Sequence, residues 1–114
     1  MRQPRLAAFV VMRTTAVALA VLVLGHFAVT HIATDVADTG SGFVLRRWSS
    51  ALWLAWDVTM LATALAHAGV GTWLLIDEQP AVARRRHLLR TALAATVGVL
   101  LLVGTAAITT AAMR

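Results

Sequence analysis

Residues 88–113, LLRTALAATVGVLLLVGTAAITTAAM, carry a single charge, Arg90, in an otherwise apolar run rich in small residues. At a rise of about 1.5 Å per residue, a helix of this length is long enough to cross the roughly 30 Å hydrocarbon core of a bilayer. Two other stretches, 7–33 and 52–76, are similar in length and apolar character. The sequence therefore predicts an all-α integral membrane protein with three transmembrane helices, forming one domain over residues 1–114.

The composition supports this class and excludes others. The chain is 60% hydrophobic and only 13% charged. Its ten basic residues are all arginines at predicted helix ends, without interleaved stacking aromatics, so its basic character does not indicate nucleic-acid binding. With no cysteine, it has no disulfide and no cysteine-ligated iron–sulfur cluster of its own. The first apolar run exceeds the usual signal-peptide core of about 7–15 residues, so we expect a retained anchor.

The arginines also predict the orientation of the chain. Most lie at the start of the first helix and in the connection between the second and third helices: Arg2, Arg5, Arg13, Arg84, Arg85, Arg86 and Arg90. The positive-inside rule places both regions in the cytoplasm. The first connection, 35–48, is less basic and is placed outside. We expect a multi-pass protein of a bacterial cytoplasmic membrane, with its N-terminus inside and its C-terminus outside.

Two histidines lie within separate apolar stretches, His26 in the first and His67 in the second. An ionisable side chain at membrane depth suggests function, and imidazole is a frequent axial ligand of haem iron. Counting from the helix midpoints, the two rings differ in depth by about 14 Å at helical rise. That is too far for one iron but suits two haems, each completed by a ligand from another chain. The alternative is that each histidine only forms a hydrogen bond across the bundle.

Two carboxylates flank His67 along the second predicted helix, each ten residues away. Asp57 follows Trp53 near the outer end, and Asp77 lies near the inner end. Carboxylates at membrane borders can relay protons or contact a quinone, so Asp57, Trp53 and Asp77 are candidate neighbours of such a site. The simpler interpretation is that both acids are interfacial charges, with Asp77 facing Arg84–Arg86.

Other polar residues of the apolar stretches are weaker candidates. Arg13 could lie near a haem propionate, although a snorkelling anchor explains it as well. His31 is about 140° around the helix from His26, so it cannot serve the same iron, but it could lie near haem or quinone. In the third predicted helix, the small residues Ala94 and Gly98 have the spacing of close helix packing.

Several short motifs follow one another in order over the three predicted helices: Arg13-Thr14-Thr15, Gly25-His26, Arg47-Trp48, Trp53-Leu54-Ala55-Trp56-Asp57, Ala66-His67-Ala68-Gly69-Val70-Gly71 and Ile76-Asp77. In this order they resemble the small hydrophobic membrane anchor of succinate dehydrogenase, respiratory complex II. The similarity is closest to the D-type anchor of actinobacterial enzymes and covers most of the chain.

This resemblance implies a complex with a flavoprotein subunit, an iron–sulfur subunit and a second membrane anchor, and it leaves open a higher oligomer. Together the anchors hold haem b and a quinone, here menaquinone, and this chain is non-catalytic by itself. His67 takes the place of the family's haem ligand, and His26 that of the first-helix ligand of diheme relatives. Asp77 matches an acid near the cytoplasmic quinone site, but Glu78 replaces the tyrosine that follows it in many relatives.

Two other functions remain open. The chain could be a small homo-oligomeric, proton-coupled transporter that uses Asp57 or His67 as its titrating group, although the third predicted helix supplies almost no polar pathway. It could also be a purely structural anchor, in which both histidines only bond across helices. The sequence leaves the haem count and the direction of succinate–fumarate conversion open.

Overall fold

A computed structural model describes residues 3–114, which fold into three long helices and four short helical segments. Helix α1 (Gln3–Phe27) continues into a π-helical turn, η1 (Ala28–Ile32). A short 3-10 turn, η2 (Val36–Asp38), and helix α2 (Ser41–Trp48) form the first connection. Helix α3 (Ala51–Glu78) is linked by the 3-10 segment η3 (Pro80–Arg85) to helix α4 (Arg86–Ala112). The described residues contain no strand, so the all-α prediction is confirmed.

The first predicted transmembrane stretch, 7–33, continues from α1 through the π-helical turn η1, and the other two lie in α3 and α4 with small differences at the ends. Helix α3 extends two residues beyond the predicted end at 76 and stops before Pro80. Proline has no N–H for the helical ladder and disfavours the helical conformation in the residue before it, and Gln79 is extended with ψ of 110°. The larger difference lies in the first connection, where the eight-residue helix α2 was not predicted.

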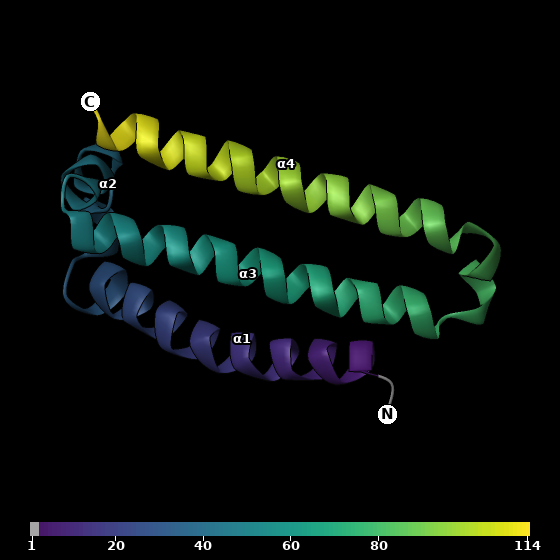
Figure 1. Cartoon of the computed structure of the whole chain (residues 1–114). Helices are drawn as coiled ribbons and strands as arrows, with labels where there is room; N and C mark the ends of the chain where they lie inside the picture. The colour runs from purple at the N-terminus through teal and green to yellow at the C-terminus, as the bar shows by residue number, and fades with distance from the viewer. Residues whose placement is uncertain (1–2) are drawn as a thin grey trace.

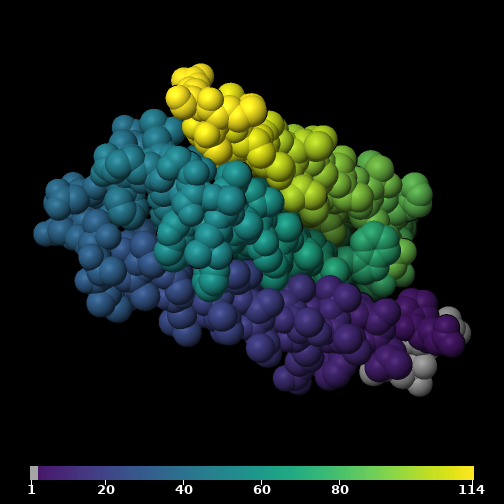
Figure 2. Space-filling view, turned by 60° about the vertical axis from the view of Figure 1, so that its left-hand side comes forward, coloured from purple at the N-terminus to yellow at the C-terminus, as the bar shows by residue number. Residues whose placement is uncertain are grey.

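The three long helices form an open layer with α3 in the middle. Figure 1 shows α1 and α4 on opposite sides of α3, and Figure 2 shows the same order on the molecular surface. Helix α2 packs on α3 and α4 at one end of the layer, called here the α2 end. The start of α1 and η3 lie at the other end, called here the η3 end. The molecule measures 49 × 25 × 23 Å, and each long helix is apolar enough to cross a membrane.

Burial in this fold is the reverse of burial in a soluble protein. No apolar side chain among the described residues is buried, and large ones such as Val17 and Leu102 are 69% and 72% exposed. Among residues 3–114, the only buried residues are Arg47 and Asp57, which are 9% and 7% exposed. Charged groups collected inside and apolar groups facing out are expected when the surroundings are lipid or partner helices.

Two glycines mark where the long helices approach most closely. A Cβ on Gly25 of α1 would lie 2.5 Å from Cζ2 of Trp56, and one on Gly104 of α4 would lie 2.6 Å from Cδ2 of Leu61. By contrast, nothing lies within 4 Å of the position of a Cβ on Gly98. The expected packing motif of Ala94 and Gly98 is therefore not where α4 meets α3 most tightly, and Gly104 has that role.

Candidate functional site

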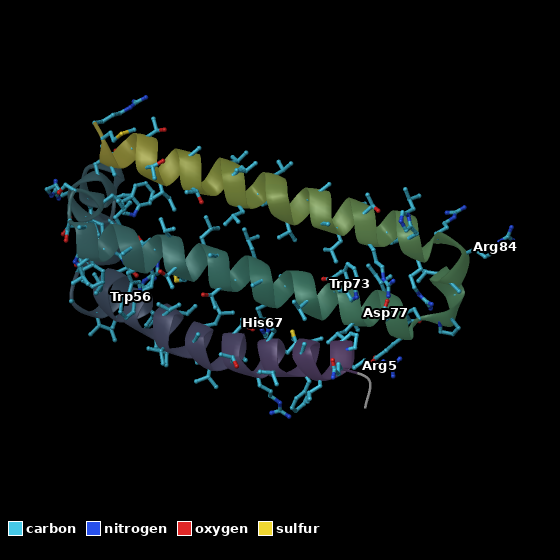
Figure 3. The ribbon with its side chains drawn as sticks, in the orientation of Figure 1. Arg5, Trp56, His67, Trp73, Asp77 and Arg84 are labelled. Atoms are coloured by element: carbon cyan, nitrogen blue, oxygen red, sulfur yellow. The ribbon has the colours of Figure 1, made fainter. Side chains whose placement is uncertain are left out.

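His67 lies on the side of α3 that faces α1. Its Nδ1 is 2.9 Å from the hydroxyl oxygen of Thr15, and this contact joins residues 52 positions apart in the chain. Figure 3 shows His67 in the middle part of the bundle, between the two helices. The ring is half-buried. It therefore forms the cross-helix hydrogen bond that the simpler interpretation of this histidine required.

The partners of Thr15 decide which nitrogen of His67 carries the proton. The Thr15 hydroxyl donates to the carbonyl oxygen of Val11 at 2.6 Å, with the carbonyl of Met12 also close, at 3.3 Å. A hydroxyl has one hydrogen, so towards His67 the Thr15 oxygen acts as an acceptor. With the hydroxyl hydrogen assigned to the Val11 carbonyl, Nδ1 of His67 carries the proton and donates to Thr15, and Nε2 keeps its lone pair. This is the tautomer that an imidazole needs to bind a metal through Nε2.

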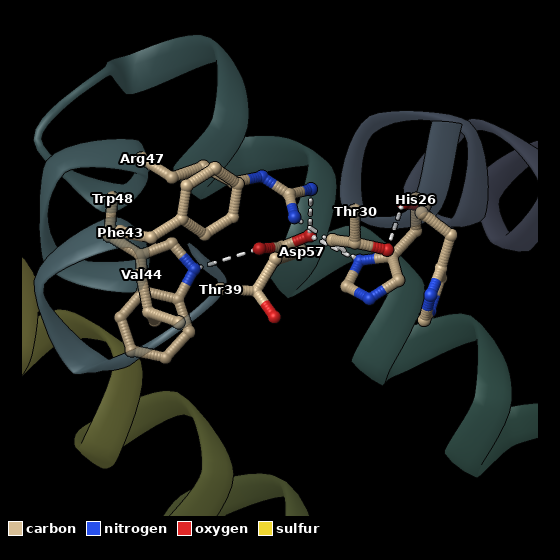
Figure 4. Close-up of a pocket in the computed structure, with 9 residues that line it drawn as sticks. His26, Thr30, Thr39, Phe43, Val44, Arg47, Trp48 and Asp57 are labelled. Atoms are coloured by element: carbon tan, nitrogen blue, oxygen red, sulfur yellow. Dashed lines mark hydrogen bonds and ion pairs between the residues drawn. The ribbon is translucent and has the colours of Figure 1, made fainter. Parts of the chain in front are cut away.

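His26 belongs to a polar cluster at the α2 end, formed with Arg47, Trp48 and Asp57 (Figure 4). Arg47 Nη2 donates to Asp57 Oδ1 at 2.9 Å, and Trp48 Nε1 donates to Asp57 Oδ2 at 2.8 Å. Nδ1 of His26 lies 3.6 Å from Asp57 Oδ1 and 3.4 Å from Arg47 Nη1. Three elements, α1, α2 and α3, thus meet around one carboxylate.

This polar cluster allows His26 two neutral tautomers. A neutral ring with its proton on Nε2 accepts a hydrogen bond from Arg47 at Nδ1. A ring with its proton on Nδ1 turns that N–H towards Asp57 and leaves Nε2 unprotonated. A metal at Nε2 would select the second state, because a carboxylate commonly accepts the remaining N–H of a ligating histidine.

Space for a cofactor lies beside the chain rather than inside it. The side chain of His26 is 38% exposed, and the cavity next to it has a volume of about 280 Å³. That cavity is too small to enclose a tetrapyrrole, so a haem on His26 would extend onto the outer surface of this chain. This chain offers one histidine at each of the two levels. A haem shared between two subunits would need one imidazole ligand from this chain and one from the other, so these histidines fit a shared haem.

The two histidines are well separated along the bundle. Thr15 marks the level of His67 on α1, and His26 follows eleven residues later on the same helix. At about 1.5 Å per residue, the two levels differ by about 16 Å. This separation is close to the value of about 14 Å expected from the sequence, and it again excludes a common iron.

The remaining candidates at the α2 end are engaged in local contacts. The Trp53 ring stacks against the Arg47 guanidinium, 4.7 Å from its central carbon, and meets Trp56 edge-on. The His31 ring stacks on Phe27 at 4.7 Å between centroids and lines the same cavity as His26. His31 is the only one of these candidates that is exposed.

At the η3 end, Asp77 forms an ion pair with Arg90 of α4. Of the arginines that Asp77 was expected to face, Arg86 donates to its backbone carbonyl at 3.2 Å, while the carboxylate itself pairs with Arg90. Arg90 also covers the Trp73 ring at 4.6 Å. In Figure 3, Arg84 points away from the helices. Asp77 thus joins α3 to α4. This structural role is compatible with the simpler interpretation of Asp77 as an interfacial charge.

Arg13 lies apart from the polar contacts of His67. It is exposed, and its guanidinium carbon is 5.2 Å from the centre of the Phe9 ring on the same helix. It precedes Thr15 by two residues, a rotation of about 200° around α1. Because Thr15 faces α3, Arg13 points away from it, and its interpretation as an anchor at the membrane surface fits this placement.

Sequence reasoning missed the residues that hold the two histidines in place. In the sequence analysis, Arg47 and Trp48 are named only as one motif of the family resemblance, and Thr15 only as the last residue of another. No contact with a histidine is predicted for any of them, and Arg47 belongs there to the polar connection 35–48. The signal that could have found it is the pairing of a lone acid in an apolar helix, Asp57, with the nearest arginine of the preceding connection.

Comparisons with known proteins do not extend this account. A scan of protein-family models finds no match to the chain, and a search of curated proteins also finds none. The interpretation of the site therefore rests on the residues and their geometry.

Proposed function

We propose that this chain is a membrane anchor subunit of a succinate:quinone oxidoreductase, which binds haem b together with a second anchor. One observation carries the proposal. Two histidines in separate transmembrane-length helices each have Nδ1 beside a polar partner within the chain, about 16 Å apart along the bundle. His67 can present Nε2 to an iron in the tautomer that donates to Thr15, and His26 can do so in the tautomer that turns its Nδ1–H towards Asp57. Two irons held in this way would lie at different levels, as expected for two haems stacked across a membrane.

In this proposal, the bound haem supplies one-electron redox chemistry, and the chain supplies its ligands and their orientation. His67, held by Thr15, and His26, held beside Asp57, are the residues that would hold the haem iron from this chain. The partners are a flavoprotein, an iron–sulfur subunit and the second anchor, in a bacterial cytoplasmic membrane. Menaquinone is the electron acceptor. The N-terminus and η3, with Arg5, Arg84 and Arg85, face the cytoplasm.

The geometry argues against Asp57 as the titrating group of a proton-coupled transporter. Both of its carboxylate oxygens are engaged, one by Arg47 and one by Trp48. A carrier group must exchange protons with both sides, and the residue is only 7% exposed. His67, the other candidate of that function, is distinguished by whether it binds haem. The purely structural anchor differs from the proposal only in lacking haem, so haem content separates the two.

The test is the ratio of haem to flavin in the complex purified through a tag on this chain, with a reduced-minus-oxidised spectrum. We expect a b-type spectrum and a ratio near two. His67→Ala should remove one spectral component and His26→Ala the other, with flavin retained in both. A ratio near one that depends on His67 alone would remove His26 from the ligand set. An intact complex with flavin and no haem would leave a structural anchor.

A further inference from the structure

From the bonds around its hydroxyl, we infer that Thr15 is a positioning residue for His67 and fixes this ring in the tautomer that can bind iron. The inference rests on the proposed function and extends it to a residue that touches neither iron nor quinone. It is carried by three contacts of one hydroxyl oxygen: 2.6 Å to Val11 O, 3.3 Å to Met12 O and 2.9 Å to His67 Nδ1.

The first step is the orientation of the hydroxyl. In a helix, a threonine hydroxyl can donate back to the carbonyl four residues earlier, which favours one of its side-chain rotamers. Thr15 makes this bond to Val11, so its hydrogen points along α1. The acceptor side of the oxygen is left for α3, where His67 lies.

The second step is the absence of a competing partner for Nδ1. Over residues 3–114, Thr15 is the only side chain or carbonyl group hydrogen-bonded to the His67 ring. Without the Thr15 oxygen, an Nδ1–H between α1 and α3 would lose its acceptor, and an unpaired buried donor costs about 1–3 kcal/mol. The ring would then favour the tautomer with its proton on Nε2, which cannot ligate iron through that nitrogen.

The third step is the effect expected on a bound metal. A hydrogen bond accepted from the distal N–H orients a ligating imidazole and raises its basicity, and its loss typically lowers metal affinity by about 10–100-fold. A more basic ligand favours ferric over ferrous iron. Loss of the Thr15 hydroxyl should therefore weaken haem binding and raise the midpoint potential of that haem alone.

The chain offers well-matched variants for the test. Thr15→Val removes the acceptor at nearly constant shape, and Thr15→Ser retains the hydroxyl. Thr96→Val is the control, because Thr96 makes the same back-bond to Ala92 O, at 2.8 Å, with no histidine as partner. If the valine variant does not assemble, Thr15→Ala removes the same acceptor without added bulk.

The complex is purified through a tag on this chain, and assembly is checked by its flavin content. Haem retained per flavin is measured against rising free imidazole, and midpoint potentials by optical redox titration. For Thr15→Val we expect haem loss at about 10–100-fold lower imidazole. If the ferric affinity falls tenfold more than the ferrous affinity, the midpoint rises by about 59 mV. Thr15→Ser and Thr96→Val should both stay close to wild type.

The outcomes separate this inference from the function on which it rests. If His67→Ala removes haem while Thr15→Val changes neither retention nor midpoint, the role of Thr15 is wrong and the ligand assignment stands. If Thr15→Ser behaves like Thr15→Val, the side chain acts through packing, and the inference is also overturned. An assembled wild-type complex without haem, or one that keeps its haem in His67→Ala, overturns the proposed function itself.

Discussion

Removing the buried carboxylate of Asp57 should be the most damaging single change in this chain. Arg47 Nη2 lies 2.9 Å from Asp57 Oδ1, and their side chains are only 6% and 9% exposed. At an effective dielectric constant near 20, the direct attraction at that distance is about 6 kcal/mol. Much of it offsets the cost of removing both charges from water. A variant that removes only one partner leaves the other buried and unpaired, which costs about 3–5 kcal/mol.

We therefore expect Asp57→Leu to lower the free energy of unfolding by about 3–5 kcal/mol. Trp48 Nε1 also loses its acceptor, which places this variant towards the upper end of the range. Replacing both charges, with Arg47→Met and Asp57→Leu together, should restore most of the loss, because an apolar pair of similar volume leaves no unpaired charge.

The assay is unfolding of the full chain in mixed micelles with increasing fractions of sodium dodecyl sulfate, followed by tryptophan fluorescence. Wild type, both single variants and the double variant form a double-mutant cycle, whose coupling energy isolates the pair. A coupling energy below about 1 kcal/mol, the value typical of an exposed pair, would refute the reasoning. So would an Asp57→Leu variant that unfolds at the same detergent fraction as wild type.

Three further predictions concern helix contacts, each measured in the same unfolding assay. Gly25→Ala should lower the free energy of unfolding by about 1–3 kcal/mol, because the new Cβ would lie 2.5 Å from Trp56. The control Gly98→Ala, with open space at that position, should be neutral or stabilising by up to about 1 kcal/mol. Equal effects of the two variants would contradict the close approach of Gly25 to Trp56. Trp56→Phe should cost about 1 kcal/mol through the lost hydrogen bond to a carbonyl of α1, and an unchanged midpoint would argue against that bond. Asp77→Asn should cost about 1 kcal/mol or less, because its pair with Arg90 is partly exposed; a loss above about 3 kcal/mol would show that this pair behaves as a buried one.

The long helices were predictable because their signal is local. A run of apolar residues long enough to cross a bilayer needs no knowledge of its neighbours, and the three runs lie in α1 with its continuation η1, in α3 and in α4. The ends were less accurate, and helix α2 was missed. Its eight residues include Gly42, Arg46 and Arg47, a composition that indicates a polar connection when read alone.

The candidate site was predictable only in part, because its partners are distant in sequence. Histidine at membrane depth drew attention to His26 and His67, but nothing near them in the chain identifies what they touch. Thr15 is 52 positions from His67, and Arg47 is 21 positions from His26. Such pairings depend on how α1 is rotated against α3. That rotation follows from packing features such as the contact between Gly25 and Trp56, which periodicity does not encode.

The polar contacts between the long helices are distributed unevenly. Those joining α1 to α3 begin at Thr15 and continue towards the α2 end, whereas the ion pair of Asp77 and Arg90 joins α4 to α3 at the η3 end. Within the described residues, the first turns of α1 and the last turns of α4 have no such tie to α3. Helices α1 and α4 are thus each joined to α3 by polar contacts over one part of their length, and these parts lie towards opposite ends of α3. A neighbouring subunit that displaced the start of α1 or the end of α4 from α3 would break no hydrogen bond between the long helices, only apolar contacts such as that of Gly104 with Leu61.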